Sequence, residues 1–338
     1  MSPEGEVDPT GLAAWATDVL VDVGPLALRI VSDVPDFPAT NYFSSAVRTA
    51  VLAGGPPREP DAEVWCVSTR DAPAHWPSDR STRALGFLKG YYVTDHAGPP
   101  VRMVSSGRQI VLFGPQLERI VWSYVVKWLL TQHAVASGAL FLKAAAVAID
   151  GQGVLVIGRG GAGKTVMISE LCRQGARFVT NSHAVVTGTS VQGVATSMRM
   201  RPGPWVDQLG VRPRRALDPR EVVVDPAEAF GGLTSDPVPL RHVALVDFQG
   251  QGQHRVERLT PPEALSVLEQ FALGLNVYRL EEDLLEAAGG DYRSFAASYA
   301  AMQERLRELV EACPCHSVVT DVQRPESVTA LRKLWCAP

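Results

Sequence analysis

The chain has 338 residues, of which 46% are hydrophobic and 20% charged, a composition typical of a globular protein with one large or two smaller domains. The 32 basic and 36 acidic side chains give a formal net charge of −4, which argues against a general nucleic-acid or anionic-membrane binder. No hydrophobic run reaches transmembrane length and residues 1–10 do not resemble a signal peptide, so we expect a cytoplasmic protein with no nucleic-acid or membrane partner.

The first third of the chain predicts a mixed, β-rich region. Residues 1–12 are acidic and carry Pro and Gly, which predicts a flexible tail. Short apolar pieces such as 26–31 alternate with turn-rich segments such as 54–61. At 116–133 apolar residues recur with helical spacing, which predicts an amphipathic helix whose broad apolar face packs into a core.

Two strands joined by a tight turn are expected next. Residues 139–150, ALFLKAAAVAID, predict one strand, the Asp-Gly pair at 150–151 predicts a hairpin turn, and 154–157 predict the second strand. Lys143 is unusual within such an apolar strand. Two alternatives stay open for its ammonium group. It contacts an anion, which is either the phosphates or an acidic substrate, or it extends to the surface.

The hairpin leads into a phosphate-binding motif. Residues 158–165, GRGGAGKT, match the Walker A pattern G-x-x-x-x-G-K-[ST] in full, between a β-branched run and a helical pattern at 165–174. Glycines let backbone N–H groups approach phosphate oxygens, and the helix N-terminus adds its positive end. The lysine neutralises β- and γ-phosphate charge and the threonine ligates magnesium. The predicted nucleotide-binding residues are Gly158, Gly160, Gly161, Ala162, Gly163, Lys164 and Thr165, with Thr165 also a metal ligand.

The segment after the motif predicts a strand that returns beside the phosphates. Helix 165–174 ends at a glycine, and ARFVT at 176–180 leads to Asn181, Ser182 and His183. In a parallel sheet the carboxyl end of such a strand lies next to the phosphate loop. We therefore expect Asn181 and His183 to face the reacting group.

Residues 141–186 as a whole resemble the HPr kinase/phosphorylase superfamily, especially its shorter relatives in peptide and natural-product pathways. The hairpin before the loop, the 17-residue spacing from Lys164 to Asn181 and the GARFVT strand carry the resemblance. It implies an α/β fold with a P-loop and a phosphoenolpyruvate-carboxykinase-like core, which uses ATP and Mg²⁺ to phosphorylate a hydroxyl on a protein, peptide or small molecule. It also implies an N-terminal variable α+β region, 13–135, a kinase-like domain, 136–338, and helices at the C-terminal end.

The chain departs from the pattern of this family at three positions. The family's two aspartates fall on Asn181 and Ser182, and a histidine of the family falls on Lys143. Asn181 and Ser182 can donate hydrogen bonds or offer an oxygen to magnesium, but neither accepts a proton at neutral pH. His183 is the nearest substitute base, with an ordinary pKa of about 6.5; the alternative is that it packs at a strand end. Candidate catalytic residues are therefore His183, Asn181 and Lys143.

Further candidates follow downstream. HVALVDF at 242–248 has the Walker B pattern of four apolar residues and an aspartate, so Asp247 is a candidate magnesium ligand, although such strings are common at strand ends. The arginine-rich segment 199–215 predicts substrate contacts, with Arg201 preferred and Asp207 as a further candidate; a solvated loop is the alternative.

The C-terminal third predicts two helices, at 261–275 and 292–313, and a closing strand at 315–322. The chain has five cysteines, an odd number without a C-x-x-C pair, which indicates free thiols in a reducing compartment. Cys313, Cys315 and His316 are close in sequence, but with no second cluster we interpret them as the entry to that strand rather than as a metal site.

Together these observations predict an ATP- and Mg²⁺-dependent phosphotransferase that acts on a hydroxyl of a small molecule or a peptide intermediate, as in natural-product biosynthesis. A nucleotide-binding regulator is one alternative, because both aspartates are replaced. An enzyme that uses ATP to activate a carboxylate or an amine, as a ligase does, is another. The sequence leaves the acceptor, the nucleotide preference and the oligomeric state open.

Overall fold

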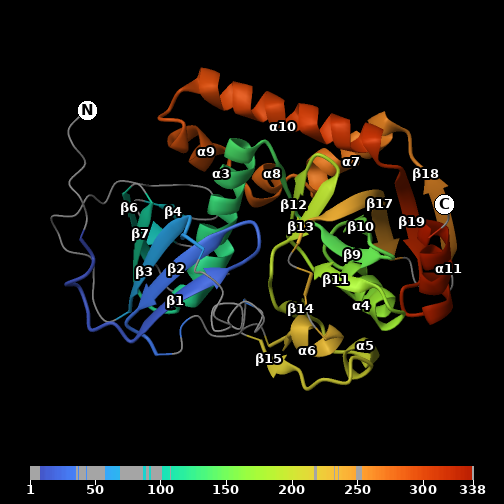
Figure 1. Ribbon diagram of the computed structural model, residues 1–338, viewed down its shortest axis with the longest axis horizontal. Helices are drawn as coiled ribbons and strands as arrows, with labels where there is room; N and C mark the ends of the chain where they lie inside the picture. The colour runs from blue at the N-terminus through green and yellow to red at the C-terminus, as the bar shows by residue number, and fades with distance from the viewer. Residues whose placement is uncertain are drawn as a thin grey trace.

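The computed structural model is a mixed α/β structure with two large sheets (Figure 1). The residues that it describes are 8–35, 37, 43, 58–68, 87–88, 91–92, 101–106, 108–216, 219–231, 233–234, 236–248 and 253–336. The first seven residues of the predicted tail and the first half of the turn-rich segment 54–61 lie outside these ranges. Within the described ranges, no helix combines the length and the apolar character that crossing a membrane requires.

The N-terminal part of the chain forms a sheet of seven described strands in the order β1-β2-β3-β7-β6-β5-β4. Its inner pairs β2 with β3 and β3 with β7 are parallel, whereas β1 and β6 are antiparallel to their neighbours. The predicted β-rich character is therefore confirmed here. The strands are β1 Thr17–Asp22, β2 Ala27–Ser32, β3 Ala62–Val67, β4 Phe87–Leu88, β5 Tyr91–Tyr92, β6 Val101–Ser106 and β7 Gln109–Phe113.

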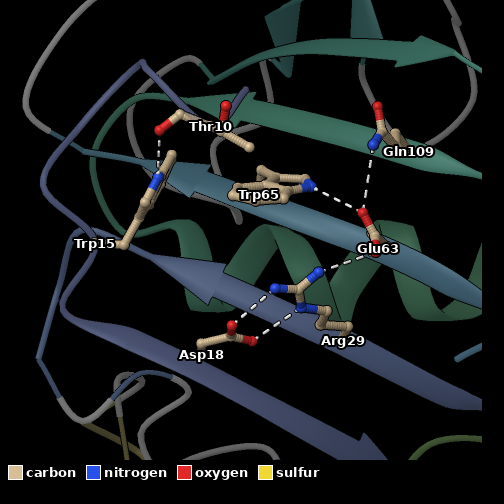
Figure 2. Close-up of polar contacts among 7 residues, drawn as sticks. All are labelled: Thr10, Trp15, Asp18, Arg29, Glu63, Trp65 and Gln109. Atoms are coloured by element: carbon tan, nitrogen blue, oxygen red, sulfur yellow. Dashed lines mark hydrogen bonds and ion pairs between the residues drawn. The ribbon is translucent and has the colours of Figure 1, made fainter. Parts of the chain in front are cut away.

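A polar ladder crosses one face of this sheet (Figure 2). Arg29 on β2 donates to Asp18 on β1 through Nε and Nη2, at 3.0 and 2.8 Å, and to Glu63 on β3 through Nη1 at 3.1 Å. The other oxygen of Glu63 accepts from Trp65 Nε1 at 3.4 Å and from Gln109 Nε2 on β7 at 3.3 Å. The ladder links four neighbouring strands, and because cross-strand pairs favour one register, it supports the alignment of this sheet.

The start of the described chain also contacts this sheet. Trp15 donates from Nε1 to the carbonyl oxygen of Thr10 at 2.9 Å (Figure 2), and its ring lies edge-on to Trp65 with centroids 5.0 Å apart. Leu12 packs against the same apolar cluster. Residues 8–12 thus have packing partners, although the sequence places them in a tail.

The helix predicted at 116–133 is confirmed, but its interior is not regular. It begins as α2 Leu117–Ile120, widens into the π-helical segment η2 Val121–Val126, and continues as α3 Lys127–Ser137. A π-helical turn adds a residue per turn and so shifts which side chains face inward. Five of the six residues of η2 are buried, and Lys127 follows directly after them.

The second sheet has nine described strands and carries the phosphate loop. Strands β10, β17 and β19 are mutually parallel; β9 runs antiparallel to both β10 and β11, so β11 runs in the direction of β10. The carboxyl ends of four strands therefore meet at one edge. The strands are β8 Leu140–Leu142, β9 Ala145–Ile149, β10 Gln152–Ile157, β11 Arg177–Thr180, β12 Ala184–Thr187, β13 Ser190–Gly193, β17 Val238–Phe248, β18 His254–Arg258 and β19 Cys315–Thr320.

The single strand predicted at 139–150 is wrong, because the structure breaks it at Lys143. Strand β8 pairs with β12, whereas β9 pairs with β10 and β11, so the two pieces join different parts of the sheet. The backbone N–H of Lys143 donates instead to the carbonyl oxygen of Ala272, at 2.6 Å. The hairpin between β9 and β10 is confirmed, and its turn residues Asp150 and Gly151 have φ of 50° and 81°.

Helices cover both faces of this sheet. The two predicted C-terminal helices and the closing strand are confirmed, although the first helix divides into α7 and α8. Helices α9 and α11 have no counterpart in the prediction.

A small sheet, β14-β16-β15, lies with α5 and α6 beside the phosphate-loop sheet (Figure 1). The elements are α4 Lys164–Arg173, α5 Pro204–Asp207, α6 Pro226–Phe230, α7 Pro261–Phe271, α8 Gly274–Tyr278, α9 Glu281–Ala287, α10 Tyr292–Ala312, α11 Pro325–Cys336, β14 Met198–Met200, β15 Arg214–Arg215 and β16 Val222–Val224.

The central strands are apolar on both faces because both faces are covered. In β10, Val154 and Val156 pack with α4 and α11, whereas Leu155 and Ile157 face the cluster that holds α7 and α10. The cluster that holds α7 and α10 also contains buried residues of the N-terminal sheet and of η2. The two large sheets therefore share one continuous core.

Candidate functional site

The phosphate loop connects β10 to α4, as the motif predicts. Gly161 and Gly163 have φ of 82° and 83°, a left-handed conformation that glycine adopts without steric cost. Gly158 lies against the neighbouring strand, where an added Cβ would come within 2.4 Å of the carbonyl oxygen of Val246. Glycines are thus required at these positions by the turn itself and by its approach to β17.

Lys164 begins α4, and its ammonium group is held over the loop. Its Nζ donates to the carbonyl oxygens of Gly158 at 2.6 Å and of Arg159 at 2.9 Å. Burial, followed by the charge of Lys143, lowers the pKa of Lys164 to about 8. A negatively charged ligand at the loop would offset both causes, since it favours the protonated amine.

Thr165 and Asn181 meet at this edge of the sheet. The Thr165 hydroxyl donates to Oδ1 of Asn181 at 2.9 Å, although the two residues come from α4 and from the end of β11. Asn181 is 7% exposed. Two side-chain oxygens at the mouth of a phosphate loop suit a hard cation such as Mg²⁺, which binds a few protein oxygens together with the phosphates of its nucleotide.

A cleft of about 510 Å³ opens beside the loop. The small sheet supplies its opposite wall, because β14 and β16 pair so that Met200 lies opposite Val222 and places Arg201 and Glu221 at the same end. Glu221 is the one carboxylate among the described residues that line the cleft. The described lining consists of residues 160–166 together with Arg199, Met200, Arg201, Trp205, Glu221, Phe248, Val322 and Gln323.

The two substrate-binding candidates have different positions. Arg201 lines the cleft, and its carbonyl oxygen accepts a hydrogen bond from Trp205 Nε1 at 2.9 Å. Asp207 is exposed at the end of α5 and is not among the lining residues. The cleft therefore unites Arg201 with Lys164 and Thr165 and leaves Asp207 outside.

Asp247 stands at the end of β17, parallel to β10, where the Walker B pattern predicts an acidic residue. Side chains of a strand alternate between faces, and here Phe248 lines the cleft while Asp247 points to the other side. Its carboxylate pairs with Arg159 at 3.2 Å. The position of Asp247 therefore favours a salt bridge that holds the loop over the predicted contact to magnesium.

His183 is 5% exposed and lies among aromatic rings rather than along the cleft. Its ring centroid is 5.0 Å from that of Trp122 and 6.0 Å from that of Phe141. Nδ1 shares a hydrogen bond with Ser182 Oγ at 2.7 Å, and Nε2 shares one with the Tyr278 hydroxyl at 2.8 Å. Burial, together with nearby cations, holds the pKa of His183 well below its usual value. Both ring nitrogens are engaged, so this placement does not support the predicted proton-accepting role.

Lys143 has left the sheet, but it does lie near the phosphate loop. It lowers the pKa of Lys164 through its charge, and its own pKa is lowered by burial and by Arg199. Its Nζ lies 5.8 Å from the ring centroid of Tyr278. The sequence left two alternatives for Lys143, an anion contact or a side chain extended to the surface. Its position near the phosphate loop favours the anion contact.

Sequence reasoning missed Glu221 and Trp205 and preferred Arg201 over Arg199, although both arginines line the cleft. Glu221 has a weak signal in the sequence, because it precedes a run of valines in a segment without a motif. Its importance depends on the pairing of β14 with β16, two strands separated by a long connection.

Comparisons with known proteins give little further support. No family model matches the chain, and no curated protein matches it. Among solved structures, the chain is similar to the HPr(Ser) kinase/phosphatase from Coxiella burnetii, with a TM-score of 0.26 and 9% sequence identity over 57% of this chain and 97% of that one. A score this low adds nothing to the geometry of the site.

Proposed function

We propose that this protein is a nucleotide-dependent phosphotransferase that uses Mg²⁺ and a nucleoside triphosphate, ATP in the first instance, to phosphorylate a hydroxyl of a small molecule or a peptide. The observation that carries the proposal is the complete phosphate loop, with Lys164 and Thr165 at the head of a cleft that also presents Arg199, Arg201 and Glu221. Phosphoryl transfer needs positioned cations more than covalent chemistry, and this cleft supplies them.

The residues present fit both cofactors. The glycine loop and the start of α4 suit a triphosphate, because backbone N–H groups and the helix dipole favour negative charge there. Thr165 and Asn181 would hold Mg²⁺, which neutralises charge on the phosphates when it is bound. Arg199 and Arg201 stand on the opposite wall, where they can stabilise charge on the transferred group.

Glu221 is the residue that we assign as proton acceptor, in place of His183. The acceptor oxygen forms a bond to the γ-phosphorus while the bond from that phosphorus to the ADP oxygen breaks, and the hydroxyl proton passes to the Glu221 carboxylate. Glu221 suits this role because it lines the cleft, whereas Asn181 and Ser182 cannot take a proton.

Calorimetric titration with Mg·ATP tests the binding step. Replacing Lys164 by Ala should weaken the affinity at least about tenfold, because a charge-assisted contact to phosphate is lost. Lys333→Ala, an exposed lysine on α11, is the matched control and should bind as the parent does. If Lys164→Ala binds Mg·ATP with unchanged affinity, the assignment of the loop is wrong.

Mass analysis of products tests the transfer step. Incubation with Mg·ATP and a panel of alcohols and serine-containing peptides should give ADP and phospho-product in equal amounts. Tight binding without turnover on any acceptor would instead indicate a nucleotide-binding regulator, an alternative that Asn181 and Ser182 favour because they replace two acidic residues of the resembled family. ADP together with a condensed product would indicate a ligase.

A further inference from the structure

Two lysines far apart in the sequence converge on one aromatic ring. Nζ of Lys127, the first residue of α3, lies 4.5 Å from the ring centroid of Tyr278, and Nζ of Lys143 lies 5.8 Å from the same centroid. An aromatic face attracts cations, but it does not neutralise their charge. The ring therefore positions two ammonium groups in one small region.

The acidic residues that the structure describes do not pair with these ammonium groups. Among the described residues, neither Lys127 nor Lys143 forms an ion pair with a carboxylate, whereas arginines elsewhere, such as Arg29 and Arg214, do. Both lysines are only partly accessible to solvent. Partly desolvated cations without a counter-charge are costly for a protein, which makes a ligand of opposite charge favourable there.

A third cation lies within electrostatic range. Burial lowers the pKa of both Lys127 and Lys143, that of Lys127 to about 7, and the charge of Arg199, on β14, lowers both further. Arg199 also lines the cleft beside the phosphate loop. The cluster of Lys127, Lys143 and Arg199, called the basic cluster below, thus reaches the cleft through Arg199.

Three hydrogen bonds and the backbone between Asn181 and Ser182 connect Tyr278 to the phosphate loop. Thr165 donates to Asn181, the neighbouring Ser182 shares a hydrogen bond with His183, and His183 shares one with the hydroxyl of Tyr278. Because His183 is neutral and bonded through both nitrogens, it holds the ring of Tyr278 in place. The ring under the two lysines is therefore fixed relative to the metal-binding end of the loop.

We propose that the basic cluster binds an anionic group, a carboxylate or a phosphate, of the molecule that accepts the phosphoryl group. This inference rests on the proposed function and specifies its substrate class. The loop and Lys164 are sufficient for the triphosphate, whereas Lys127 lies on a helix that the cleft lining does not include. The acceptor is thus an acidic alcohol, or a peptide whose target hydroxyl lies near an acidic group.

Titration with sulfate at constant ionic strength tests the basic cluster, since sulfate is a compact dianion that does not titrate near neutral pH. The protein is first saturated with Mg·ADP, so that the phosphate loop is occupied. Lys127→Met and Lys143→Met should each weaken sulfate binding at least about tenfold, while Lys333→Met should not change it. Equal sulfate affinity in all four proteins would overturn the proposal.

The same experiment separates this inference from the proposed function. Mg·ADP affinity is measured on every variant. Intact nucleotide binding shows that Lys127→Met and Lys143→Met are folded. If the parent protein does not bind Mg·ADP, that result contradicts the proposed function alone. Sulfate titration of Lys164→Ala then reports on the basic cluster without the cation of the loop. Competition by acetate would indicate a carboxylate ligand, and competition by methyl phosphate without competition by acetate would indicate a phosphate.

The parent protein gives a second readout that needs no variant. Sulfate affinity should fall about tenfold between pH 6 and pH 8 as Lys127 loses its proton, because the free amine no longer attracts the anion. His183, which faces the same ring, does not produce this change, because burial holds its pKa well below the usual value and it stays neutral across this range. Sulfate affinity that is flat across this range would contradict the role of Lys127.

Discussion

Glu221 is the residue on which the proposed transfer step depends most directly. It is the one carboxylate among the described residues that line the cleft, and it stands on the wall opposite Lys164 and Thr165. Asn181, by contrast, is tied to Thr165 and suits the metal better than the proton. Under the proposed function, nucleotide and metal would therefore bind at one wall of the cleft and the acceptor at the other.

Glu221→Gln should lower kcat by about 10²- to 10⁴-fold, the usual range for a general base. The affinity for Mg·ATP should stay within about threefold, because the amide keeps the shape of the side chain and Glu221 is not part of the loop. Glu308→Gln, an exposed position on α10, serves as control. Steady-state kinetics with an acceptor identified by product analysis provide the measurement, and a parent-like kcat would show that the proton goes elsewhere.

The burial of His183 leads us to expect that the free energy of unfolding depends on pH. Its pKa is lowered in the folded protein by burial, so below its ordinary value of about 6.5 the unfolded chain binds a proton that the native state does not. The free energy of unfolding should therefore fall as the pH decreases from about 6.5, by up to ~1.4 kcal/mol per pH unit. His183→Gln should remove this part of the slope. Urea unfolding at pH 5.0, 6.0 and 7.0 measures it, and an equal slope in both proteins would contradict the burial of a neutral ring.

At the scale of elements, the junction of β10, the loop and α4 is fixed by backbone packing. The loop leaves β10 beside β17, and Gly158 occupies the point of closest approach. Asp247 follows on β17 and pairs with Arg159, so both the backbone and a salt bridge hold the loop against this strand. A salt bridge at this exposure contributes little, so the backbone fit carries most of the effect.

Gly158→Ala should destabilise the protein by ~2 kcal/mol or more, because its Cβ would overlap the carbonyl oxygen of Val246, a backbone atom that cannot move aside easily. Gly160→Ala in the same loop is the matched control. An added Cβ there meets nothing within 4 Å, and its φ is not positive, so the stability should change by less than ~0.5 kcal/mol. Thermal unfolding of both variants without nucleotide measures the two changes in stability. An equal loss of stability in Gly158→Ala and Gly160→Ala would show that the contact with β17 is unimportant.

Across the whole molecule, the N-terminal sheet and the phosphate-loop sheet pack into one apolar cluster. Helix α3 and the η2 segment stand between the two sheets (Figure 1), and their buried side chains belong to the same cluster as residues of both. A shared core couples the stability of its parts, because neither part keeps its buried surface if the other unfolds. We therefore expect the described molecule to unfold as one unit.

Thermal unfolding should show a single transition when followed by far-UV circular dichroism and by tryptophan fluorescence. Mg·ADP at about 100 times its dissociation constant should stabilise the whole molecule by ~2.7 kcal/mol, although it binds at one sheet only. Hydrogen exchange of amides in β2 and β3, far from the loop, reports whether the nucleotide protects them. Two separate transitions, or protection confined to the loop and α4, would indicate two independently stable domains.

Elements with strong local signals were predictable. The phosphate loop, the hairpin before it, the helix after it and the long helix at 292–312 follow from glycines, turn residues and apolar periodicity within short windows. Lys164 and Thr165 could be placed at the start of the helix after the loop and on the cleft, because the Walker A pattern is a run of contiguous residues. The break at Lys143 could not, because ALFLKAAAVAID has the pattern of one strand, and only pairing with β12 on one side and β10 on the other divides it.

The local residue order was thus enough to specify a phosphate-binding loop between a strand and a helix, since that geometry depends on neighbours along the chain. The environment of the site was settled by distant contacts. Glu221 reaches the cleft through the pairing of two remote strands, and His183 is withdrawn from it by Trp122 and Tyr278. Burial and the charges of Arg199 and Lys143 lower the pKa of Lys127, and no short window of sequence contains all of these partners.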